Sequence, residues 1–329
     1  MTAATVLISS AGRRVELVRG FRSALETLGL DGRVLAVDRS PLASALQVAD
    51  EGFLVPSCDD PAFVTEMLEL CHKHRVDLLV PTIDPELPVY AAARDEFASA
   101  GTTVAVGSTQ AVAVAADKSR THEWLTDNGF PTVGQATPAE VRSDPRGWPF
   151  PLVVKPRRGS AAVGVSVVSD ALAFDLAVRG GDVVVQTVAP GVEYTVDALV
   201  DRSGRCVCAV PRRRLEVRAG EVSKAVTVRS PELEALAVAV SEALPGAYGV
   251  ITLQIFRDDD TARTAVIEMN ARFGGGFPLS REAGADFPRW LLEEITGMPS
   301  SATTDGWRDG LVMLRYDAAV FLDDTEAAR

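Results

Sequence analysis

Segment 265–276, with the sequence AVIEMNARFGGG, constrains this chain more than any other. Side chains alternate between the two faces of a strand, so Glu268, Asn270 and Arg272 share one face while apolar residues occupy the other. The segment therefore predicts a strand that covers a core with one face and binds a ligand with the other.

An apolar strand at 250–256 precedes this segment, and the connection between the two is polar and rich in Asp. This order predicts an antiparallel hairpin in which Gln254 lies beside Glu268. The carboxylate of Glu268 and the amide oxygens of Gln254 and Asn270 are hard ligands, which suit Mg2+. A solvated sheet face with an incidental glutamate is the alternative for this hairpin taken alone.

The composition excludes several classes of protein. With 329 residues, of which 47% are hydrophobic and 24% charged, the chain is long enough for two or three domains with substantial cores. Its formal net charge of -12 argues against nucleic acid as a partner. No apolar run approaches the roughly 18 residues that span a bilayer, and no charged segment precedes the first strand, so we expect a cytoplasmic protein without a membrane partner.

Residues 1–116 alternate apolar strands with amphipathic helices. This order predicts a doubly wound α/β domain, in which helices cover both faces of a parallel sheet. Ligands of such sheets bind beyond the carboxyl ends of the strands, where the loops 10–14 and 82–86 are expected to lie. Only one glycine of a three-glycine dinucleotide fingerprint follows the first strand, which disfavours NAD.

Charged residues of these two loops are candidates for substrate contacts. Arg13 and Arg14 stand at the start of a helix, where they either hold a substrate anion or are simply solvated. Asp84 and Glu86 lie in the second loop and are expected at the same site.

Residues 117–187 predict a small α+β domain with a loop of small residues at 156–164. The backbone N–H groups of such a loop can close on a phosphate, because glycine leaves room for the anion. An ordinary hairpin turn is the alternative, and no P-loop motif is present. The residues expected to contact nucleotide from this loop are Arg158, Gly159, Ser160 and Gly164.

Residues 188–329 predict a larger α+β domain that carries the metal-ligand hairpin. The strand at 183–186 breaks near Val188 and resumes at 192–200. A flat base can lie against this break, with backbone groups contacting its edge and Glu193 meeting the ribose.

A basic stretch at 211–224 concentrates positive charge in an otherwise acidic chain. We expect it to be a loop that contacts a phosphate or an acyl phosphate, with Lys224 at its end. An ordinary basic surface loop is the alternative.

Together these motifs resemble the ATP-grasp superfamily, most closely its carbamoyl phosphate synthetase and biotin carboxylase branch. The most specific motif is Gln254 followed by EMNAR at 268–272, which is similar to the paired magnesium ligands and following arginine of carbamoyl phosphate synthetase. Lys118 and Lys155 resemble the two family lysines that reach the nucleotide phosphates. The resemblance covers nearly the whole chain. It implies a doubly wound leading domain, a small lid domain and a larger C-terminal domain that binds ATP and Mg2+, for which Mn2+ is a possible substitute.

The hinge between the last two domains carries a further resemblance. Gln186 and Glu193 stand seven residues apart, like the adenine-side and ribose-side residues of the family. Many relatives have Glu where this chain has Gln186, and its lid loop has fewer glycines than that of biotin carboxylase. No biotinyl carrier motif or glutaminase segment is present, which disfavours biotin and carbamoyl phosphate chemistry.

The resemblance implies an ADP-forming carboxylate-amine ligase that acts through an acyl phosphate on an amino acid or a similar small metabolite. In this hypothesis Arg272 stabilises the transferring group with help from Lys224, and specificity resides partly in the segment around Gly275. The partners are then small carboxylates and amines, with a homodimer possible. The alternatives are an ATP-dependent carboxylase that forms carboxyphosphate and a nucleotide-binding regulator without turnover.

Overall fold

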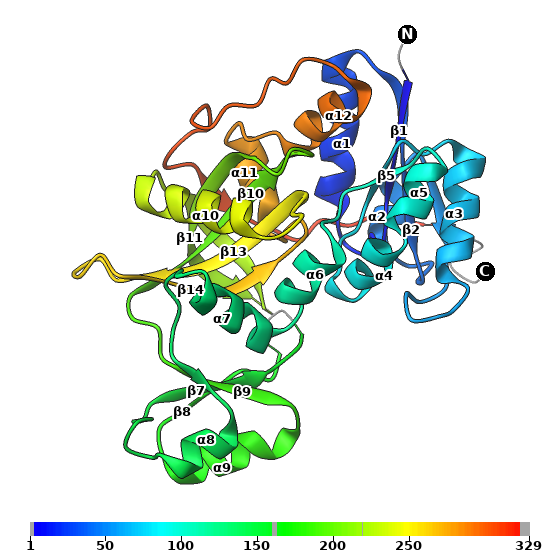
Figure 1. Cartoon of the computed structure of the whole chain (residues 1–329). Coiled ribbons are helices and arrows are strands. Elements are labelled where there is room, and N and C mark those ends of the chain that lie inside the picture. The colour runs from blue at the N-terminus through cyan, green and yellow to red at the C-terminus, as the bar shows by residue number, and fades with distance from the viewer. Residues whose placement is uncertain (1–2, 160–162, 219, 323–329) are drawn as a thin grey trace.

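The computed structural model describes residues 3–159, 163–218 and 220–322 (Figure 1). Its strands form three sheets, one of five strands, one of four and one of six. The four-stranded sheet lies apart from the rest of the molecule at the lower end of Figure 1. The α/β architecture expected from the sequence is confirmed.

The first sheet is parallel and has the strand order β3-β2-β1-β4-β5. This order places β1 at the centre and confirms the doubly wound arrangement. Two α-helices, which meet at Ala93, lie between β4 and β5. The strands are β1 (Ala3–Ile8), β2 (Asp31–Asp38), β3 (Glu51–Leu54), β4 (Leu78–Val80) and β5 (Thr103–Val104). The helices that accompany them are α1 (Val15–Leu28), α2 (Ser44–Val48), α3 (Phe63–His74), α4 (Leu87–Ala92) and α5 (Arg94–Ser99).

Alternation along the central strands sends apolar side chains into two separate cores. Leu7 and Leu35 pack with α3 and α4 on one face of the sheet. Val6 and Ile8 pack with α1 on the other face. The sheet is thus buried on both faces, which accounts for the nearly continuous apolar runs of its strands.

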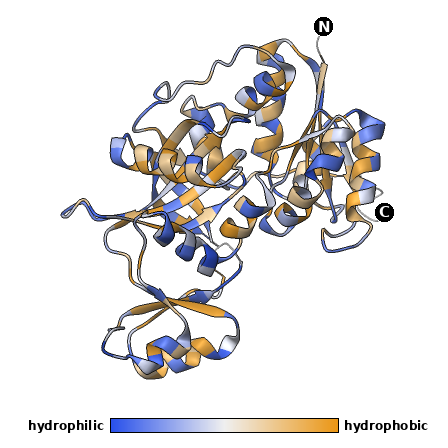
Figure 2. Ribbon diagram, in the orientation of Figure 1, coloured by the Kyte–Doolittle hydropathy of each residue, from blue (hydrophilic) through white to orange (hydrophobic). Residues whose placement is uncertain are grey.

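The small sheet is antiparallel, with the order β6-β9-β7-β8. Two helices, α8 and α9, cover one of its faces, and the crossing strands β7 and β9 are largely hydrophobic (Figure 2). Its first strand, β6, begins at Gln135, after Pro131 and Thr132, which bond to the backbone of Val266 in the large sheet. The elements are β6 (Gln135–Ala136), β7 (Leu152–Pro156), β8 (Ser166–Val168), β9 (Val183–Thr187), α8 (Pro138–Ser143) and α9 (Ala171–Ala177).

The large sheet is antiparallel and has the order β14-β13-β10-β11-β12-β15. Within the basic stretch, which was expected to be a loop, residues 211–218 and 221–224 instead belong to two paired strands. Its strands are β10 (Val192–Val200), β11 (Cys206–Arg218), β12 (Glu221–Thr227), β13 (Gly249–Arg257), β14 (Thr264–Asn270) and β15 (Val312–Leu314). The remaining helices are α6 (Thr109–Ala115), α7 (Lys118–Asp127), α10 (Pro231–Ala243), α11 (Phe277–Glu282) and α12 (Phe287–Thr296).

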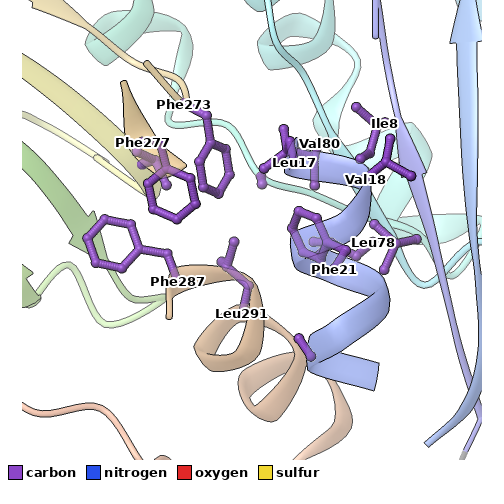
Figure 3. Packing of buried hydrophobic residues seen from close by; sticks show 14 of the residues in the cluster. Ile8, Leu17, Val18, Phe21, Leu78, Val80, Phe273, Phe277, Phe287 and Leu291 are labelled. Atoms are coloured by element: carbon purple, nitrogen blue, oxygen red, sulfur yellow. The ribbon is translucent and has the colours of Figure 1, made fainter. Parts of the chain in front are cut away.

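The two faces of the large sheet differ in chemistry. One face is apolar and packs against α10 and α7. The other is apolar only at one end, where it meets a cluster of aromatic side chains that also contacts α1 of the first domain (Figure 3). Phe273, Phe277 and Phe287 lie in this cluster, facing Leu17 and Phe21. The polar remainder of that face forms the candidate site.

No helix within residues 3–159, 163–218 and 220–322 combines the length and the apolar character that a membrane crossing requires.

Candidate functional site

The metal-ligand hairpin has the register that the sequence predicted. Gln254 of β13 pairs directly with Glu268 of β14, and Thr252 pairs with Asn270. Paired residues share a face of the sheet, so all four side chains lie on one side. The amide of Asn270 donates a hydrogen bond of 3.1 Å to Glu268 Oε1.

An irregularity in this hairpin decides which residues face the site. The register shifts between Gln254 and Ile255 of β13, so that Ile255 pairs with Val266 rather than with Ile267. Ile267 is therefore an extra residue in β14, as in a β-bulge. Val266 and Ile255 are both fully buried in the core behind the sheet, while Glu268 faces the opposite side.

The donor set of this face fits magnesium. It contains one carboxylate, Glu268, and two side-chain amides, Gln254 and Asn270. Among the residues that the structure describes, no three His, Cys, Asp or Glu gather in a group that could hold a metal ion. A hard cation that takes its other ligands from water and from phosphate oxygens suits such a sparse set, whereas zinc does not.

Lys155 connects the small sheet to this hairpin. Its side chain is 4% exposed, and its ammonium donates a 3.4 Å hydrogen bond to the backbone oxygen of Ile267. The pKa of Lys155 is lowered to about 8, mainly by burial. Glu268 and Glu193 oppose this shift, and the ammonium of Lys118 adds to it. Four charged groups predicted for the site therefore lie close together.

Lys118 begins α7 and approaches the same region from a third element. Its helix is capped by Asp117, whose carboxylate accepts from the backbone N–H groups of Ser119 and Arg120. The ammonium of Lys118 donates a 2.8 Å hydrogen bond to the oxygen of Gly159. The lysine thus contacts the start of the predicted lid loop.

The lid loop is attached at its base to α7. Asp117 accepts two 2.8 Å hydrogen bonds from Arg157 and lies 3.4 Å from the guanidinium of Arg158, which is otherwise exposed. Gly164 has a positive φ of 75° and closes the loop beside Pro156. The predicted contact residue Ser160 lies outside the described residues.

The hinge residues lie where strands leave the small sheet and enter the large one. Gln186 is buried on β9, and its amide nitrogen donates a 2.7 Å hydrogen bond to Gln135. Val188 follows β9 and is 44% exposed. Glu193, on the site face of β10, forms an ion pair with Arg214 of β11.

Arg272 joins the metal strand to the first domain. Its guanidinium lies 2.8 Å from Asp84 Oδ2 and donates a 3.2 Å hydrogen bond to the oxygen of Asn270. Asp84 comes from the loop after β4, 188 residues away in sequence. The structure thereby brings the predicted substrate loop to the predicted metal ligands.

Arg14 lies beside this pair. Burial lowers the pKa of its guanidinium, as does the positive charge of Arg272, while Glu221 and Asp84 oppose the shift. A Cβ atom on Gly275 would lie 3.3 Å from the Arg14 guanidinium and 3.3 Å from the Glu221 carboxyl carbon. The glycine after the metal strand therefore leaves room for an arginine from the first domain.

Two predicted substrate residues lie elsewhere. Glu86 is fully buried, with Oε2 accepting from the hydroxyls of Ser9 and Ser10 and Oε1 from the N–H groups of Thr82 and Ile83. This corrects the expectation of a substrate contact, because Glu86 instead holds two loops together and burial raises its pKa.

The side chain of Arg13 is 84% exposed and lies 3.8 Å from Glu221. Arg13 thus occupies the solvated alternative that the sequence left open.

The predicted catalytic role of Lys224 is also corrected. Ala225 shares the site face with Arg214, so the preceding Lys224 points to the opposite face of β12. Its half-exposed ammonium pairs with Glu216 at 2.7 Å. A surface ion pair of this kind leaves no group for catalysis at the site.

Sequence reasoning missed a buried ion pair beneath the site. Asp197 and Arg212 are 0% and 2% exposed and form an ion pair diagonally across β10 and β11. Ser280 donates a 2.7 Å hydrogen bond to the same carboxylate, and a Cβ on Gly276 would lie 2.8 Å from Arg212 Nε. The sequence contained a signal for this ion pair. The two strands each carry a charged residue, Asp197 or Arg212, at a position where the alternation predicts a side chain directed into the protein.

The fold and the site together define a class. A doubly wound domain, a small lid-like sheet and a large antiparallel sheet with converging lysines and a metal-ligand hairpin are the ATP-grasp architecture. Residues 6–105 match the family described as PylC-like, N-terminal domain, and residues 180–316 match the family described as ATP-grasp in the biosynthetic pathway with Ter operon. The chain is an ATP-grasp protein, and the resemblance expected from its motifs is confirmed.

Particular relatives extend these matches. The chain is 27% identical to the formate-dependent phosphoribosylglycinamide formyltransferase of Synechococcus sp. (strain CC9605), over 91% of this chain and 78% of that protein. The biotin carboxylase domain of Hydrogenobacter thermophilus 2-oxoglutarate carboxylase, solved as a dimer with MgADP, ADP and bicarbonate, has a TM-score of 0.73 at 18% identity, covering 95% of this chain and 74% of that one. The N5-carboxyaminoimidazole synthetase of Staphylococcus aureus has a TM-score of 0.70 at 15% identity, covering 92% and 80%. These similarities place the chain among ATP-grasp enzymes.

Proposed function

We propose that the protein is an ATP-dependent, ADP-forming carboxylate-amine ligase that acts through an acyl phosphate. The observation that carries this proposal is that Lys155, Lys118 and Glu268, from three different elements, lie close together between the small and large sheets. Two nearly buried ammonium groups facing a metal-type carboxylate suit a polyphosphate with its cation.

The nucleotide lies between the small and large sheets. Lys118 and Lys155 hold phosphate oxygens, and the lid loop closes over them with Arg158, Gly159 and Gly164. The base lies at the hinge beside Gln186 and Val188, and its ribose meets Glu193. We expect Glu193 to exchange part of its pairing with Arg214 for the ribose hydroxyls.

Magnesium is held by Glu268, Asn270 and Gln254. A cation held there would supply positive charge that neutralises the phosphates of the nucleotide. The side-chain oxygen of Asn270 accepts one hydrogen bond from Arg272, and its second lone pair would remain for the cation.

The substrate carboxylate lies between Arg272 and Arg14. One carboxylate oxygen attacks the terminal phosphorus, and the bond from that phosphorus to the ADP oxygen breaks. The amine nitrogen then attacks the acyl carbon, phosphate departs with the former carboxylate oxygen, and the nitrogen loses a proton. Arg272 stabilises the negative charge that develops in both steps.

Asp84 fixes the position of Arg272 and has the charge to attract an amine. A site that offers both guanidinium and carboxylate groups suits an amino acid or a similar small metabolite, and we propose this substrate class. The neighbour from Hydrogenobacter thermophilus was solved as a dimer, and a homodimer is proposed for this chain as well.

Carboxyphosphate formation is the second candidate function, because the same neighbour was solved with bicarbonate. The two proposals differ in their requirement for the acid. Phosphate release that depends on bicarbonate favours carboxylation, whereas release that depends on an organic carboxylate and an amine favours ligation.

The test is a screen of carboxylate and amine pairs with purified protein and MgATP, read by phosphate release and by product mass. We expect ADP and phosphate as the products. With an 18O-labelled carboxylate, one label should appear in the released phosphate. Accumulation of AMP, or unlabelled phosphate during ligation, would overturn the mechanism, and absence of any turnover would favour a nucleotide-binding regulator.

A further inference from the structure

A chain of three polar groups connects α7 with the face of the small sheet. The side-chain nitrogen of Gln135 donates a 3.3 Å hydrogen bond to the backbone oxygen of Lys118. The side-chain nitrogen of Gln186 donates a 2.7 Å hydrogen bond to the oxygen of Gln135. Gln186 is 4% exposed and Gln135 is half-buried, so these amides depend on each other rather than on bulk water.

The direction of this chain is fixed at one end. The oxygen of Lys118 is a backbone carbonyl of a helix and can only accept hydrogen bonds. Gln135 must therefore direct its nitrogen toward Lys118 and its oxygen toward Gln186. Gln186 must in turn direct its nitrogen toward Gln135, which leaves its own oxygen as an acceptor on the other side. Within the described part of the chain, no group donates to this oxygen.

The position of Gln186 follows from the strand register. Val153 pairs with Gln186, and Lys155 pairs with Val184, so Gln186 and Lys155 lie on the same face of the small sheet. Lys155 shows which way this face is turned, because its ammonium contacts the backbone of β14 in the large sheet. The free oxygen of Gln186 thus lies on the face of the small sheet that is turned toward β14, about 7 Å along the sheet from Lys155.

We propose that Gln135 is a specificity-determining residue, which holds the Gln186 amide with its oxygen toward the base so that a 6-amino purine is accepted and a 6-oxo purine is rejected. The proposal rests on the nucleotide site proposed above. The amino group of adenine donates to the Gln186 oxygen, as it would to a carboxylate. A 6-oxo group would face that oxygen with lone pairs on both sides.

Rotation of the Gln186 amide does not relieve this repulsion. A rotated Gln186 would direct its oxygen at the oxygen of Gln135, so Gln135 would have to rotate as well. Its oxygen would then face the carbonyl of Lys118, which the helix holds in place. Acceptance of a 6-oxo purine therefore costs one of the two hydrogen bonds of the chain: the bond between Gln186 and Gln135 if Gln186 rotates alone, or the bond from Gln135 to Lys118 if both amides rotate.

The test compares the dissociation constants of MgATP and MgITP. Inosine carries a 6-oxo group but lacks the 2-amino group of guanine, so the comparison isolates one edge of the base. We expect the wild-type protein to prefer ATP, and Gln135→Met to reduce the ATP preference about tenfold, mainly through tighter ITP binding. Methionine keeps the length of the side chain without its hydrogen bonds. The control is Gln47→Met at an exposed glutamine of α2, which should leave the preference unchanged.

A second variant separates orientation from loss of structure. In the double variant Gln135→Met with Gln186→Glu, both oxygens of the carboxylate are acceptors in either orientation, so the preference for ATP should return. An unchanged preference in Gln135→Met, or no recovery in the double variant, overturns the role of Gln135 even if the protein binds ATP and turns over. A wild-type protein that binds neither nucleotide instead overturns the proposed nucleotide site.

Discussion

Replacing Lys155 with methionine is expected to change how stability depends on pH. Burial lowers the pKa of Lys155 in the folded protein from 10.5 to about 8, and the side chain is only 4% exposed. Between these two values the unfolded chain holds a proton that the folded protein has lost. The free energy of unfolding therefore rises with pH in this window, because the unfolded state binds more protons.

The magnitude follows from the shift. One pKa unit corresponds to about 1.4 kcal/mol, so the wild-type protein should gain about 2 to 3 kcal/mol from this group between pH 7 and pH 10. Lys155→Met has no such group. At neutral pH the variant is relieved of a desolvated charge, and its stability relative to wild type should be highest there and decline as the pH rises.

The assay is urea unfolding of both proteins at pH 7, 8.5 and 10. Tyrosines and cysteines also titrate in this range, but they are common to both proteins and cancel in the difference. Lys73→Met, at an exposed position of α3, is the matched control and should track the wild type at each pH. A difference between wild type and Lys155→Met that is the same at pH 7 and pH 10 would refute the reasoning.

Three further predictions concern the site. Glu268→Gln should lower turnover by on the order of 100-fold while leaving the unfolding midpoint unchanged, and near-normal turnover would refute the metal assignment. Gly276→Ala should destabilise the fold by about 1 to 3 kcal/mol in urea unfolding, because its Cβ would lie 2.8 Å from a buried guanidinium, whereas Gly180→Ala, with open space around it, should cost far less. Arg14→Gln should raise the KM of the carboxylate substrate at least tenfold without changing that of ATP, and an equal effect from Arg13→Gln, whose side chain is 84% exposed, would show that general charge rather than a specific contact is responsible.

The sequence predicted those parts of the site that depend on local alternation. The pairing of Gln254 with Glu268 followed from two neighbouring strands and a polar connection, and the structure has this register. The doubly wound domain followed in the same way from alternating strands and helices. In these cases the interacting residues are near each other in sequence, so a periodic pattern is enough to place them.

Contacts between distant segments were not predictable in this way. The pair of Arg272 and Asp84 joins residues 188 positions apart, and only the folded structure shows that they meet. Lys224 was assigned from charge alone, but the strand that contains it turns this side chain to the opposite face. Glu86 was assigned from its place in a loop, and its burial depends on hydroxyl groups supplied by another loop.

The extra residue in β14 changes which alternate side chains of the strand face the core. Before Ile267, the side chain of Val266 packs into the core. After Ile267, the side chains of Glu268 and Asn270 lie on the opposite face, at the candidate site. In a regular strand without a bulge, Val266 and Glu268 would lie on the same face, because side chains two positions apart point the same way. Deleting Ile267 would place Glu268 directly after Val266, and plain alternation would then put the two side chains on opposite faces without a bulge. The bulge thus lets the strand carry one residue more than its pairing with β13 needs, while Val266 stays in the core and Glu268 on the opposite face.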